Sequence, residues 1–377
     1  MARVAKHSML TDSDIARWRL HNQHLTSPFT ASAKDTVVGL LAVQAENPSQ
    51  AAWAVACRTR RPSPEDLAKL LDDGTVVRTH VLRSTWHFVS ADDIGWLLDL
   101  TSPRVRRVTG DALRTAYGLD DRAIDSAAAT VLDALGERGD RTRGELGELL
   151  QASGLALKGQ LLMLLLAHLE LEGLICSGRP ADGEHSYALL AQRAPKTRRL
   201  DRGEALAELA LRYFTGHGPA TERDLTYWAT LTITDVRAGL SEVKDRLEAF
   251  EHAGRTYWHA PGDPPPPGQQ PRGHLLQILD ECYRGYQDSR WVLDSAGDVP
   301  RGREAAIGMA LVDGQMVTAM RRNLGKDRVE FALEPYRPLK SGEVDALTGA
   351  ANRYGEFLGL PASLRLVSRH REGSGSS

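Results

Sequence analysis

One pattern of predicted elements recurs along the chain, and it constrains the fold more than any other feature of the sequence. Its clearest copy begins with residues 122–136, where apolar side chains fall at helical spacing up to Gly136. Thr142 then opens a second, short helix, with Glu145 as its partner in a capping box. A longer helix over 158–172 and two β-like runs, LICSG and SYALLA, complete the unit. These are the elements of a winged helix-turn-helix.

The same order of elements follows this unit. Residues 203–216 are rich in Ala and Leu and predict a helix, and Thr221 caps a second one. Thr234 starts a third helix that runs to about Leu247. A hairpin, LEAFEHAGRTYWHA, comes next and turns at Ala253-Gly254.

A looser copy precedes the central unit. Its predicted helices lie near residues 12–25, 34–46, 48–59 and 64–73. The β-like runs VVRTHVL and STWHFVS follow, and a separate amphipathic helix starts near Ala91-Asp92. Three copies of one small unit indicate a tandem array.

The composition changes at PGDPPPPGQQPRG, a stiff and extended connector. Beyond it the runs AIGMALVDG, QMVTAMRRN and DRVEFALEP predict strands, with Asp313-Gly314 as a tight turn. A helix over 341–357 and a last strand, SLRLVSR, follow. We expect a small antiparallel barrel or sandwich closed by that helix.

A chain of 377 residues is too long for one hydrophobic core. We therefore predict a mainly α protein with β (α+β), built of three tandem winged-helix domains and a C-terminal antiparallel β-barrel. The predicted domains are 1–115, 116–198, 199–262 and 263–377.

The composition is that of a globular protein, with 42% hydrophobic and 25% charged residues. The net charge of −2 excludes a globally basic nucleic-acid coat, but a local basic face is sufficient for DNA binding. Basic residues do gather in short runs, one of which comprises Arg321, Arg322, Lys326 and Arg328.

Cys57, Cys176 and Cys282 are odd in number and lack a CxxC spacing. We expect buried, reduced thiols, without a disulfide framework or a metal site. No apolar stretch approaches the roughly 20 residues of a membrane span, and the N-terminus has no apolar core of signal-peptide length. We expect a cytoplasmic protein that does not bind membranes.

The first candidate site is Gln44 with Glu46, which we place at the end of an apolar helix terminated by Asn47-Pro48. On a straight helix two such side chains do not share a face, but at an unwinding helix end both can reach one cavity. The alternative is that Gln44 is a surface residue and Glu46 caps the helix that begins near Ser49. Spacing alone favours this alternative.

A second candidate lies in the strand-like stretch RSTWHF. Arg83, Thr85 and His87 share one of its faces, while Trp86 and Phe88 share the other. A lone histidine is usually structural, but one aligned with arginine and threonine favours a functional cleft.

A carboxylate pair, Asp280-Glu281, follows an apolar run and is interpreted as structural rather than catalytic. The sequence contains no Gly-rich phosphate loop, HExxH or GxSxG motif.

Five blocks, in their order and spacing, resemble the AlkZ/YcaQ-type winged-helix DNA glycosylases over nearly the whole chain. They are VQAENPSQAAWAVACRTR, LRSTWHFVSADDIGWLL, RYFTGHGPATERDLTYWATL, LLQILDECYRGYQD and IGMALVDGQMVTAMRR. The resemblance implies three winged helices arranged in a C-shape, with a C-terminal β-barrel.

The catalytic Gln-x-Gln or Gln-x-Asp motif of that family falls here on Gln44-Ala45-Glu46. Glutamate keeps the carboxylate of the second form but is one methylene longer than aspartate. His87 falls in a stretch similar to the family's RGTxH pattern, with Ser84 where glycine is usual. The family's barrel hairpin, which probes the minor groove, corresponds to Arg321–Arg328.

The resemblance implies a DNA glycosylase that removes bulky N7- or N3-alkylated purines from double-stranded DNA and that acts on interstrand crosslinks. Glu46 and Gln44 would be catalytic, and no cofactor or metal is expected. We expect a monomer. The expected contacts with DNA or the lesion are His87, Arg83, Thr85, Arg321, Arg322, Lys326 and Arg328.

Two other readings stay open. Winged helices occur far more often in transcription factors than in enzymes, and a fold alone does not settle function. The chain could therefore be a non-enzymatic DNA-binding regulator. It could also be a lesion-binding protein in which Glu46 does not place the attacking water.

Overall fold

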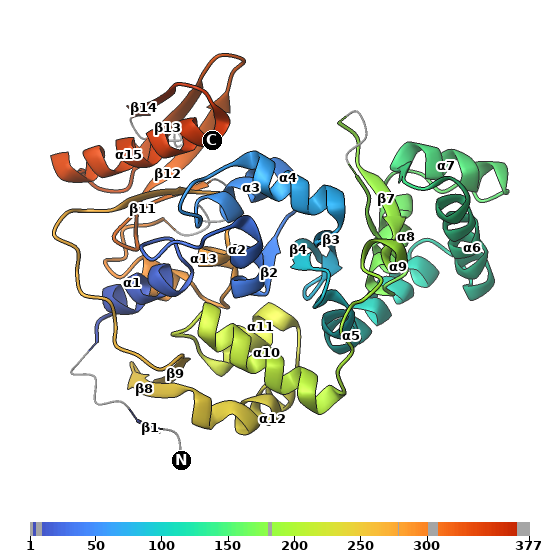
Figure 1. The fold of residues 1–377 in the computed structure, drawn as a ribbon, viewed down its shortest axis with the longest axis horizontal. Coiled ribbons are helices and arrows are strands. Elements are labelled where there is room, and N and C mark those ends of the chain that lie inside the picture. Colours follow the sequence, from blue (N-terminus) through green and yellow to red (C-terminus); the bar gives the residue numbers. More distant parts are fainter. Residues whose placement is uncertain (1–2, 5–9, 180–182, 278, 301–307, 368–377) are drawn as a thin grey trace, which may run out of the picture.

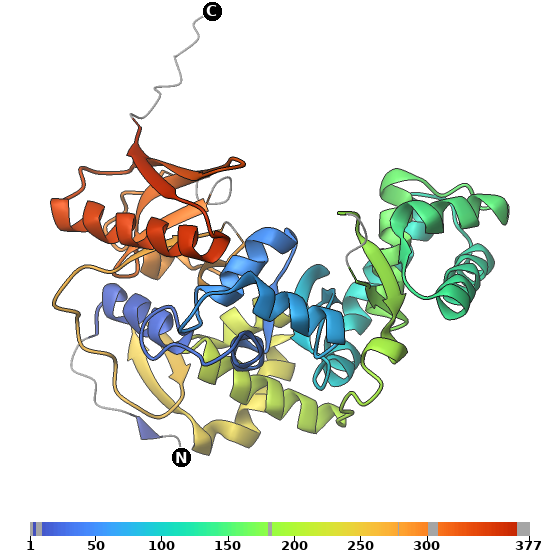
Figure 2. The same ribbon diagram turned by 45° about the horizontal axis from the view of Figure 1, so that its top comes forward.

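The computed structural model describes residues 3–4, 10–179, 183–277, 279–300 and 308–367. Helices and four small sheets follow one another in an open arc (Figures 1 and 2). A five-stranded sheet near the C-terminus, covered by α15 (Ser341–Leu358), forms one end of the arc. The helices α6 (Asp121–Arg138), α7 (Arg143–Ala152) and α8 (Gly159–Leu171) form the other.

The N-terminal third of the chain contains a three-stranded sheet in the order β2-β4-β3, with helices before and after it. Its elements are α1 (Asp12–Asn22), α2 (Ala33–Leu40), β2 (Ala42–Gln44), α3 (Pro48–Ala56), α4 (Pro64–Asp73), β3 (Val76–Val81), β4 (Thr85–Ser90) and α5 (Ile94–Thr115). Both pairings are antiparallel, and His87 on the central strand lies opposite Gln44 on one side and Thr79 on the other.

The prediction of a single helix over 34–46 is wrong. The helix α2 ends at Leu40, Leu41 takes a φ of 67°, and Ala42–Gln44 pairs with β4 as a strand. All three residues of this strand are buried. A short, continuously apolar run has no period that separates a strand from a helix, so the partner strand decides.

The next unit follows its predicted order closely. It comprises α6, β5 (Arg141–Thr142), α7, α8, β6 (Ile175–Ser177), β7 (Ser186–Leu189) and α9 (Leu190–Arg193). The capping box is confirmed, because the Thr142 hydroxyl accepts the Glu145 N–H at 3.2 Å and the Glu145 carboxylate accepts the Thr142 N–H at 2.7 Å. The first helix continues beyond the predicted Gly136 and ends before Gly139, which has a φ of 77°.

The third unit comprises α10 (Arg202–Gly216), α11 (Glu222–Ala229), α12 (Ile233–Val243), a 3-10 turn (Lys244–Arg246), β8 (Glu248–His252) and β9 (Arg255–His259). A short strand, β1 (Arg3–Val4), joins β8 in parallel. The turn at Ala253-Gly254 is confirmed, with φ angles of 49° and 71°. The cap of the third helix is Thr232 rather than the predicted Thr234, because its side chain accepts the Asp235 N–H.

The C-terminal sheet has the order β10-β11-β12-β13-β14. Its elements and their neighbours are β10 (Gly273–Leu276), α13 (Glu281–Arg284), α14 (Arg290–Leu293), β11 (Gly308–Val312), β12 (Gln315–Leu324), β13 (Val329–Pro335), α15 and β14 (Ala362–Leu366). The turn at Asp313-Gly314 is confirmed, with φ angles of 49° and 81°. The last two residues of the predicted strand SLRLVSR, Ser368 and Arg369, lie outside the described residues.

The last pairing departs from the predicted all-antiparallel arrangement, since β14 runs parallel to β13. The helix α15 lies between the two strands in sequence and carries the chain back along the sheet, as a parallel pairing requires. The other pairings of this sheet are antiparallel, and β10 and β14 stand at its edges.

The hydrophobic cores are shared between segments far apart in sequence. One cluster joins Trp18 and Trp53 of the N-terminal helices to Phe331 and Tyr354 of the C-terminal sheet and its helix. A second joins the buried faces around β3, β4 and α5 to α10, α11 and α12. The second cluster thereby packs the β2-β4-β3 sheet against α10, α11 and α12.

Cys57, Cys176 and Cys282 are buried free thiols, as expected. Burial raises the pKa of the Cys57 and Cys282 thiols to about 12, so these groups stay protonated at neutral pH. Within the described ranges, no helix combines the length and the apolar character needed to cross a membrane.

Candidate active site

Gln44 ends β2 and is held at two points. Its backbone N–H donates to a carboxylate oxygen of Glu281 at 2.9 Å, and its side-chain Oε1 accepts from Arg83 at 3.2 Å. The residue is 5% exposed. Among the described residues, the amide nitrogen of its side chain has no hydrogen bond, so this donor remains for a ligand.

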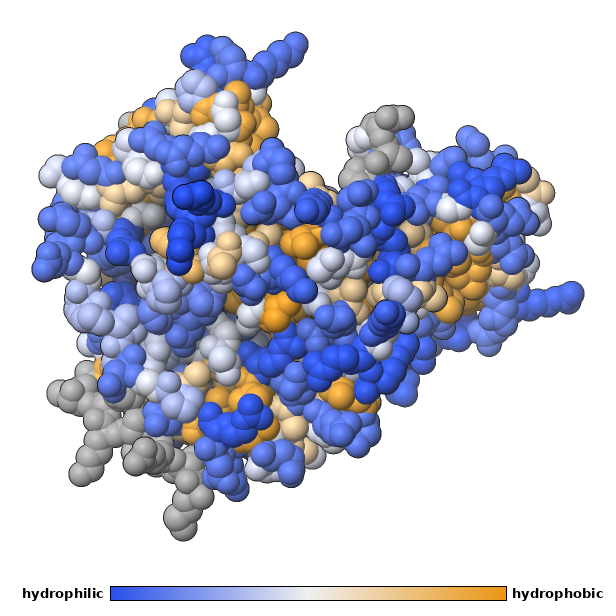
Figure 3. Space-filling view, viewed as in Figure 1, coloured by the Kyte–Doolittle hydropathy of each residue, from blue (hydrophilic) through white to orange (hydrophobic). Residues whose placement is uncertain are grey.

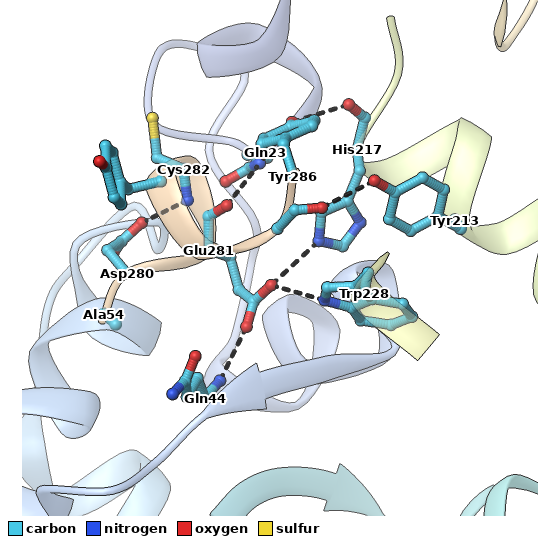
Figure 4. Close-up of polar contacts among 12 residues, drawn as sticks. Gln23, Gln44, Ala54, Tyr213, His217, Trp228, Asp280, Glu281, Cys282 and Tyr286 are labelled. Carbon is cyan, nitrogen blue, oxygen red and sulfur yellow. Dashed lines mark hydrogen bonds and ion pairs between the residues drawn. The ribbon is translucent and has the colours of Figure 1, made fainter. Parts of the chain in front are cut away.

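The carboxylate that holds Gln44 is itself fully buried and saturated (Figure 4). Besides the Gln44 N–H, Glu281 accepts from Trp228 Nε1 at 2.9 Å and from His217 Nε2 at 3.3 Å. Burial alone would raise the pKa of Glu281, but the hydrogen bond and charge interaction with His217 hold it at about 2. Burial lowers the pKa of His217, and Glu281 stays ionised at neutral pH.

Asp280 has a different set of partners. It forms a buried ion pair with Arg58, with N–O distances of 2.7 and 3.0 Å, and it caps α13 through the Cys282 N–H. Arg58 also donates to Gln23 of the loop after α1 at 2.9 Å. These saturated contacts agree with the structural interpretation of the Asp280-Glu281 pair.

Glu46 lies two residues beyond Gln44 and is partly exposed. One carboxylate oxygen accepts the backbone N–H of Trp86 at 3.2 Å. The Arg78 guanidinium donates to the carbonyl of Ala45 at 2.9 Å and to that of Glu46 at 3.4 Å, and it lies 4.5 Å from the centre of the Trp86 ring. The carboxylate thus occupies a polar position beside a buried cation.

The alternative interpretation of this motif is wrong in both parts. Gln44 is buried rather than a surface residue. The helix after the motif is capped by Asn47, whose Oδ1 accepts the Gln50 N–H at 3.3 Å, and not by Glu46.

The second candidate stretch meets the first at Gln44. Arg83 lies in the turn between β3 and β4, and its guanidinium also donates to the Trp228 carbonyl at 3.2 Å. The next residue, Ser84, has a φ of 62°, a left-handed backbone conformation that glycine adopts without strain. Thr85 is partly exposed at the start of β4.

His87 lies directly opposite Gln44 and is fully buried. Its Nδ1–H donates to the Thr85 carbonyl at 2.8 Å, and Nε2 has no partner among the described residues. Burial lowers the pKa of His87 to about 4, so the imidazole is neutral at pH 7. Since no part of the ring reaches the surface, its influence on a ligand passes through its neighbours.

The basic hairpin forms a separate group at the end of the arc (Figure 2). Arg321 and Arg322 lie on β12, and Lys326 and Arg328 lie in its turn to β13. Arg321, Lys326 and Arg328 are exposed, whereas Arg322 donates to the Tyr354 hydroxyl and is partly buried. No hydrogen bond or ion pair in the described ranges joins this group to Gln44 or Glu46.

The described residues contain no group of three His, Cys, Asp or Glu side chains placed to hold a metal ion. The polar groups gathered at the site are the Gln44 amide, the Glu46 carboxylate and the Arg78 and Arg83 guanidinium groups.

Residues 37–357 match the family described as DNA glycosylase AlkZ-like. The chain belongs to this AlkZ-like family. The resemblance read from the sequence blocks is thereby confirmed.

A curated relative and a solved structure, both from Streptomyces sahachiroi, carry this comparison further. An interstrand DNA cross-link repair glycosylase from Streptomyces sahachiroi is 26% identical over 255 residues, which is 63% of this chain and 66% of that relative, just under two thirds of its length. The solved structure of Streptomyces sahachiroi DNA glycosylase AlkZ matches with a TM-score of 0.76 at 20% identity, over 96% of this chain and 100% of that one. At this identity the match shows a shared fold of mixed helices and sheets.

Sequence reasoning missed Arg78, although the sequence holds a signal for it. Arg78 is the only arginine in VVRTHVL, a run apolar enough to predict a buried strand. Arginine is seldom buried without partners, so a buried arginine indicates a specific set of acceptors. The link from Glu281 to Gln44 had no such signal, because 237 residues separate the two.

Proposed function

We propose that this member of the AlkZ-like family is a DNA glycosylase that hydrolyses the N-glycosidic bond of bulky N7- or N3-alkylated purines in double-stranded DNA, including purines joined in interstrand crosslinks. Family membership and the cross-link repair activity named for the Streptomyces sahachiroi relative support this proposal. The observation that carries it is the pairing, at the end of β2, of a tightly held Gln44 with a partly exposed Glu46.

We assign the domains as three winged helices, 1–115, 116–198 and 199–262, and a C-terminal β-domain, 263–377. In this assignment the hollow side of the arc receives the duplex. Arg321, Lys326 and Arg328 contact its backbone, and Arg83 and Thr85 lie close to the lesion.

The chemistry requires little acid catalysis. Alkylation at N7 or N3 gives the purine a positive charge, so the base leaves with the electron pair of its bond to C1′ and becomes neutral. The enzyme must stabilise the cationic sugar and supply a water whose oxygen bonds to C1′. The Glu46 carboxylate opposes the sugar charge and accepts a proton from that water. The products are the free base and an abasic site.

Gln44 orients the reactants in this mechanism. Arg83 donates a hydrogen bond to the side-chain oxygen of Gln44, so the side-chain N–H groups of Gln44 are directed to a water or to the deoxyribose. His87, on the facing strand, supports Gln44 from within the protein. The longer side chain of glutamate, compared with aspartate, extends the reach of the carboxylate toward the sugar.

The decisive experiment replaces Glu46 by glutamine, which keeps the shape and removes the charge. We expect Glu46→Gln to slow single-turnover excision by about 10²–10⁴-fold, the range of a general base, with DNA affinity nearly unchanged. The substrate is duplex DNA carrying N7-methylguanine or a nitrogen-mustard crosslink, and alkali converts abasic sites into strand breaks. Glu242→Gln, on the exposed surface of α12, is the matched control. Unchanged excision by Glu46→Gln would remove Glu46 from the mechanism.

The same assay separates the two other readings. A transcriptional regulator would bind a particular DNA sequence and produce no abasic sites from any of these substrates. A lesion-binding protein would prefer alkylated DNA but leave its glycosidic bonds intact.

A further inference from the structure

In the described part of the chain, one buried guanidinium, that of Arg78, contacts the backbone at Ala45 and Glu46. We propose that it is a positioning residue, which fixes the backbone on both sides of Glu46 and thereby sets the place of the carboxylate. The proposal rests on the proposed function, since it concerns the same carboxylate.

The first support is the pattern of hydrogen bonds. Arg78 Nε donates to the carbonyl of Ala45 at 2.9 Å, and Nη2 donates to the carbonyl of Glu46 at 3.4 Å. These carbonyls belong to the two peptide groups that flank the Cα atom of Glu46. A planar guanidinium offers several donors in a fixed geometry, so one side chain restrains both peptides. Rotation of the backbone at Glu46 would break at least one of these bonds.

The second support is a contact with the residue that holds the carboxylate. The Trp86 N–H donates to a Glu46 carboxylate oxygen at 3.2 Å, and the Arg78 guanidinium lies 4.5 Å from the centre of the Trp86 ring. Arg78 therefore restrains Glu46 both through its backbone and through the neighbour that binds its side chain.

The third support is charge. Arg78 is 7% exposed, and a buried cation requires anionic neighbours. Burial lowers the pKa of Arg78, while the carboxylates of Glu170 and Glu46 oppose that shift. Glu170 is already paired with His80. Glu46 is the carboxylate on the segment that Arg78 binds, so the attraction between the two charges adds to the hydrogen bonds that Arg78 donates to the backbone.

Arg78 also contacts the unit that contains β6 and β7. Its Nη1 donates to Ser177 Oγ at 3.1 Å, at the end of β6, and lies 3.4 Å from His185 Nε2. Burial and the charge of Arg78 lower the pKa of His185 to about 3, so this ring stays neutral beside the cation. The guanidinium is thereby also held through Nη1, the nitrogen that does not bond to the backbone beside Glu46.

A double-mutant cycle tests the proposal in the full-length protein. We expect Arg78→Met to slow single-turnover excision by about 10–100-fold, because the Glu46 carboxylate would no longer be held in place. The affinity for DNA should change by less than about threefold. In a Glu46→Gln background, the same change should slow excision further by less than about threefold. Arg78→Lys keeps the charge and one donor, and it should recover part of the lost rate.

Arg353→Met is the matched control. Arg353 also donates to two backbone carbonyls, those of Cys57 at 3.3 Å and Thr59 at 2.7 Å, and lies over the Phe29 ring. Its loss should lower the unfolding midpoint without lowering the excision rate of the folded protein. This separates general loss of structure from loss of position at Glu46.

Each outcome has one meaning. Equal slowing by Arg78→Met in the presence and absence of the Glu46 carboxylate, or no slowing at all, would overturn the positioning role. If Arg78→Met does not fold, the cycle is run with Arg78→Lys, and the same equality would overturn the proposal. An unchanged rate for Glu46→Gln alone would instead contradict the proposed mechanism, and the positioning role with it.

Discussion

Several imidazole groups of this protein lie where water cannot solvate a charge. His87 is fully buried between β2 and β3, and in the described part of the chain its ring makes one hydrogen bond, from the Nδ1 proton to the Thr85 carbonyl. A second proton on Nε2 would have no acceptor among the described residues. The cost of burying its charge exceeds the attraction of Glu281, and the charge of Arg83 opposes it further. Burial lowers the pKa values of His217 and His274 for the same reason. Neutral histidine is therefore part of the folded state.

This predicts a loss of stability in mild acid. The pKa of His87 is about 4 in the folded protein and 6.5 in the unfolded chain, so between these values the unfolded state binds the extra proton. The free energy of unfolding should therefore fall as the pH falls from about 6.5 to about 4, with about 3 kcal/mol from His87 alone.

Urea denaturation at pH 7, 5.5 and 4 measures this dependence. The variant His87→Gln lacks the titrating group and should lose less stability over the same interval than the unchanged protein. An equal loss in both proteins would contradict the folded-state pKa of His87.

The elements differ in how far they could be predicted from the sequence. The helix that begins after Thr142 and the turn at Ala253-Gly254 depend on residues within a few positions of each other, and both were predicted correctly. The strand β2 depends on β4, more than 40 positions later, and its apolar run predicts a helix equally well. The environment of Gln44 was hidden for the same reason, because its partners Arg83 and Glu281 come from two distant segments. Family resemblance located the motif, but not the residues that hold it.

The packing of α10 against α12 depends on a glycine. A Cβ atom added at Gly239 would meet the backbone carbonyl of Leu206, which cannot move without shifting α10. We expect Gly239→Ala to lower the free energy of unfolding by about 1–3 kcal/mol, as overpacked cores do. Chemical denaturation followed by circular dichroism measures the change.

The control is the same substitution at an open helical position. Gly349 lies inside α15, and a Cβ atom there would meet nothing within 4 Å. Gly349→Ala should raise the free energy of unfolding by roughly 0.5–1 kcal/mol, because alanine loses less backbone entropy in a helix. A similar effect of the two substitutions would contradict the close contact at Gly239.

At the scale of the whole molecule, the arc places its chemical groups at different points. The outline is notched between the C-terminal sheet and the end formed by α6, α7 and α8 (Figure 3). Gln44 belongs to the central sheet, whereas the basic hairpin belongs to one end (Figure 1). A duplex bound in the hollow would meet the hairpin and the central sheet at separate places, so affinity and excision should respond to different substitutions.

The double variant Arg321→Ala, Lys326→Ala tests this separation. If each side chain contacts a phosphate, affinity for DNA should fall, and the slope of log K against log salt should become shallower by about 0.9 per lost contact. Single-turnover excision at saturating protein should stay within about threefold of the original rate. Binding is measured by fluorescence anisotropy over a series of salt concentrations.

The control removes two charges elsewhere. Lys244 and Arg246 are exposed just after α12, on the side of the arc away from the hairpin (Figures 1 and 2). Lys244→Ala, Arg246→Ala should leave the salt dependence unchanged. An equal loss of affinity in both double variants would show a general effect of charge instead.

The hydrogen bond between Glu281 and the Gln44 N–H has a consequence for how this protein can be inherited and altered. A gene fragment that ends before codon 281 would encode the motif of β2 and omit its anchor. A recombinant gene that takes Gln44 and Glu281 from different relatives would keep this contact only if it also encodes Trp228 and His217. These two residues bind the same carboxylate and hold it in place. Because the donor is the main-chain N–H of residue 44, which every residue except proline has, the carboxylate at position 281 should persist across lineages whatever side chain stands at position 44.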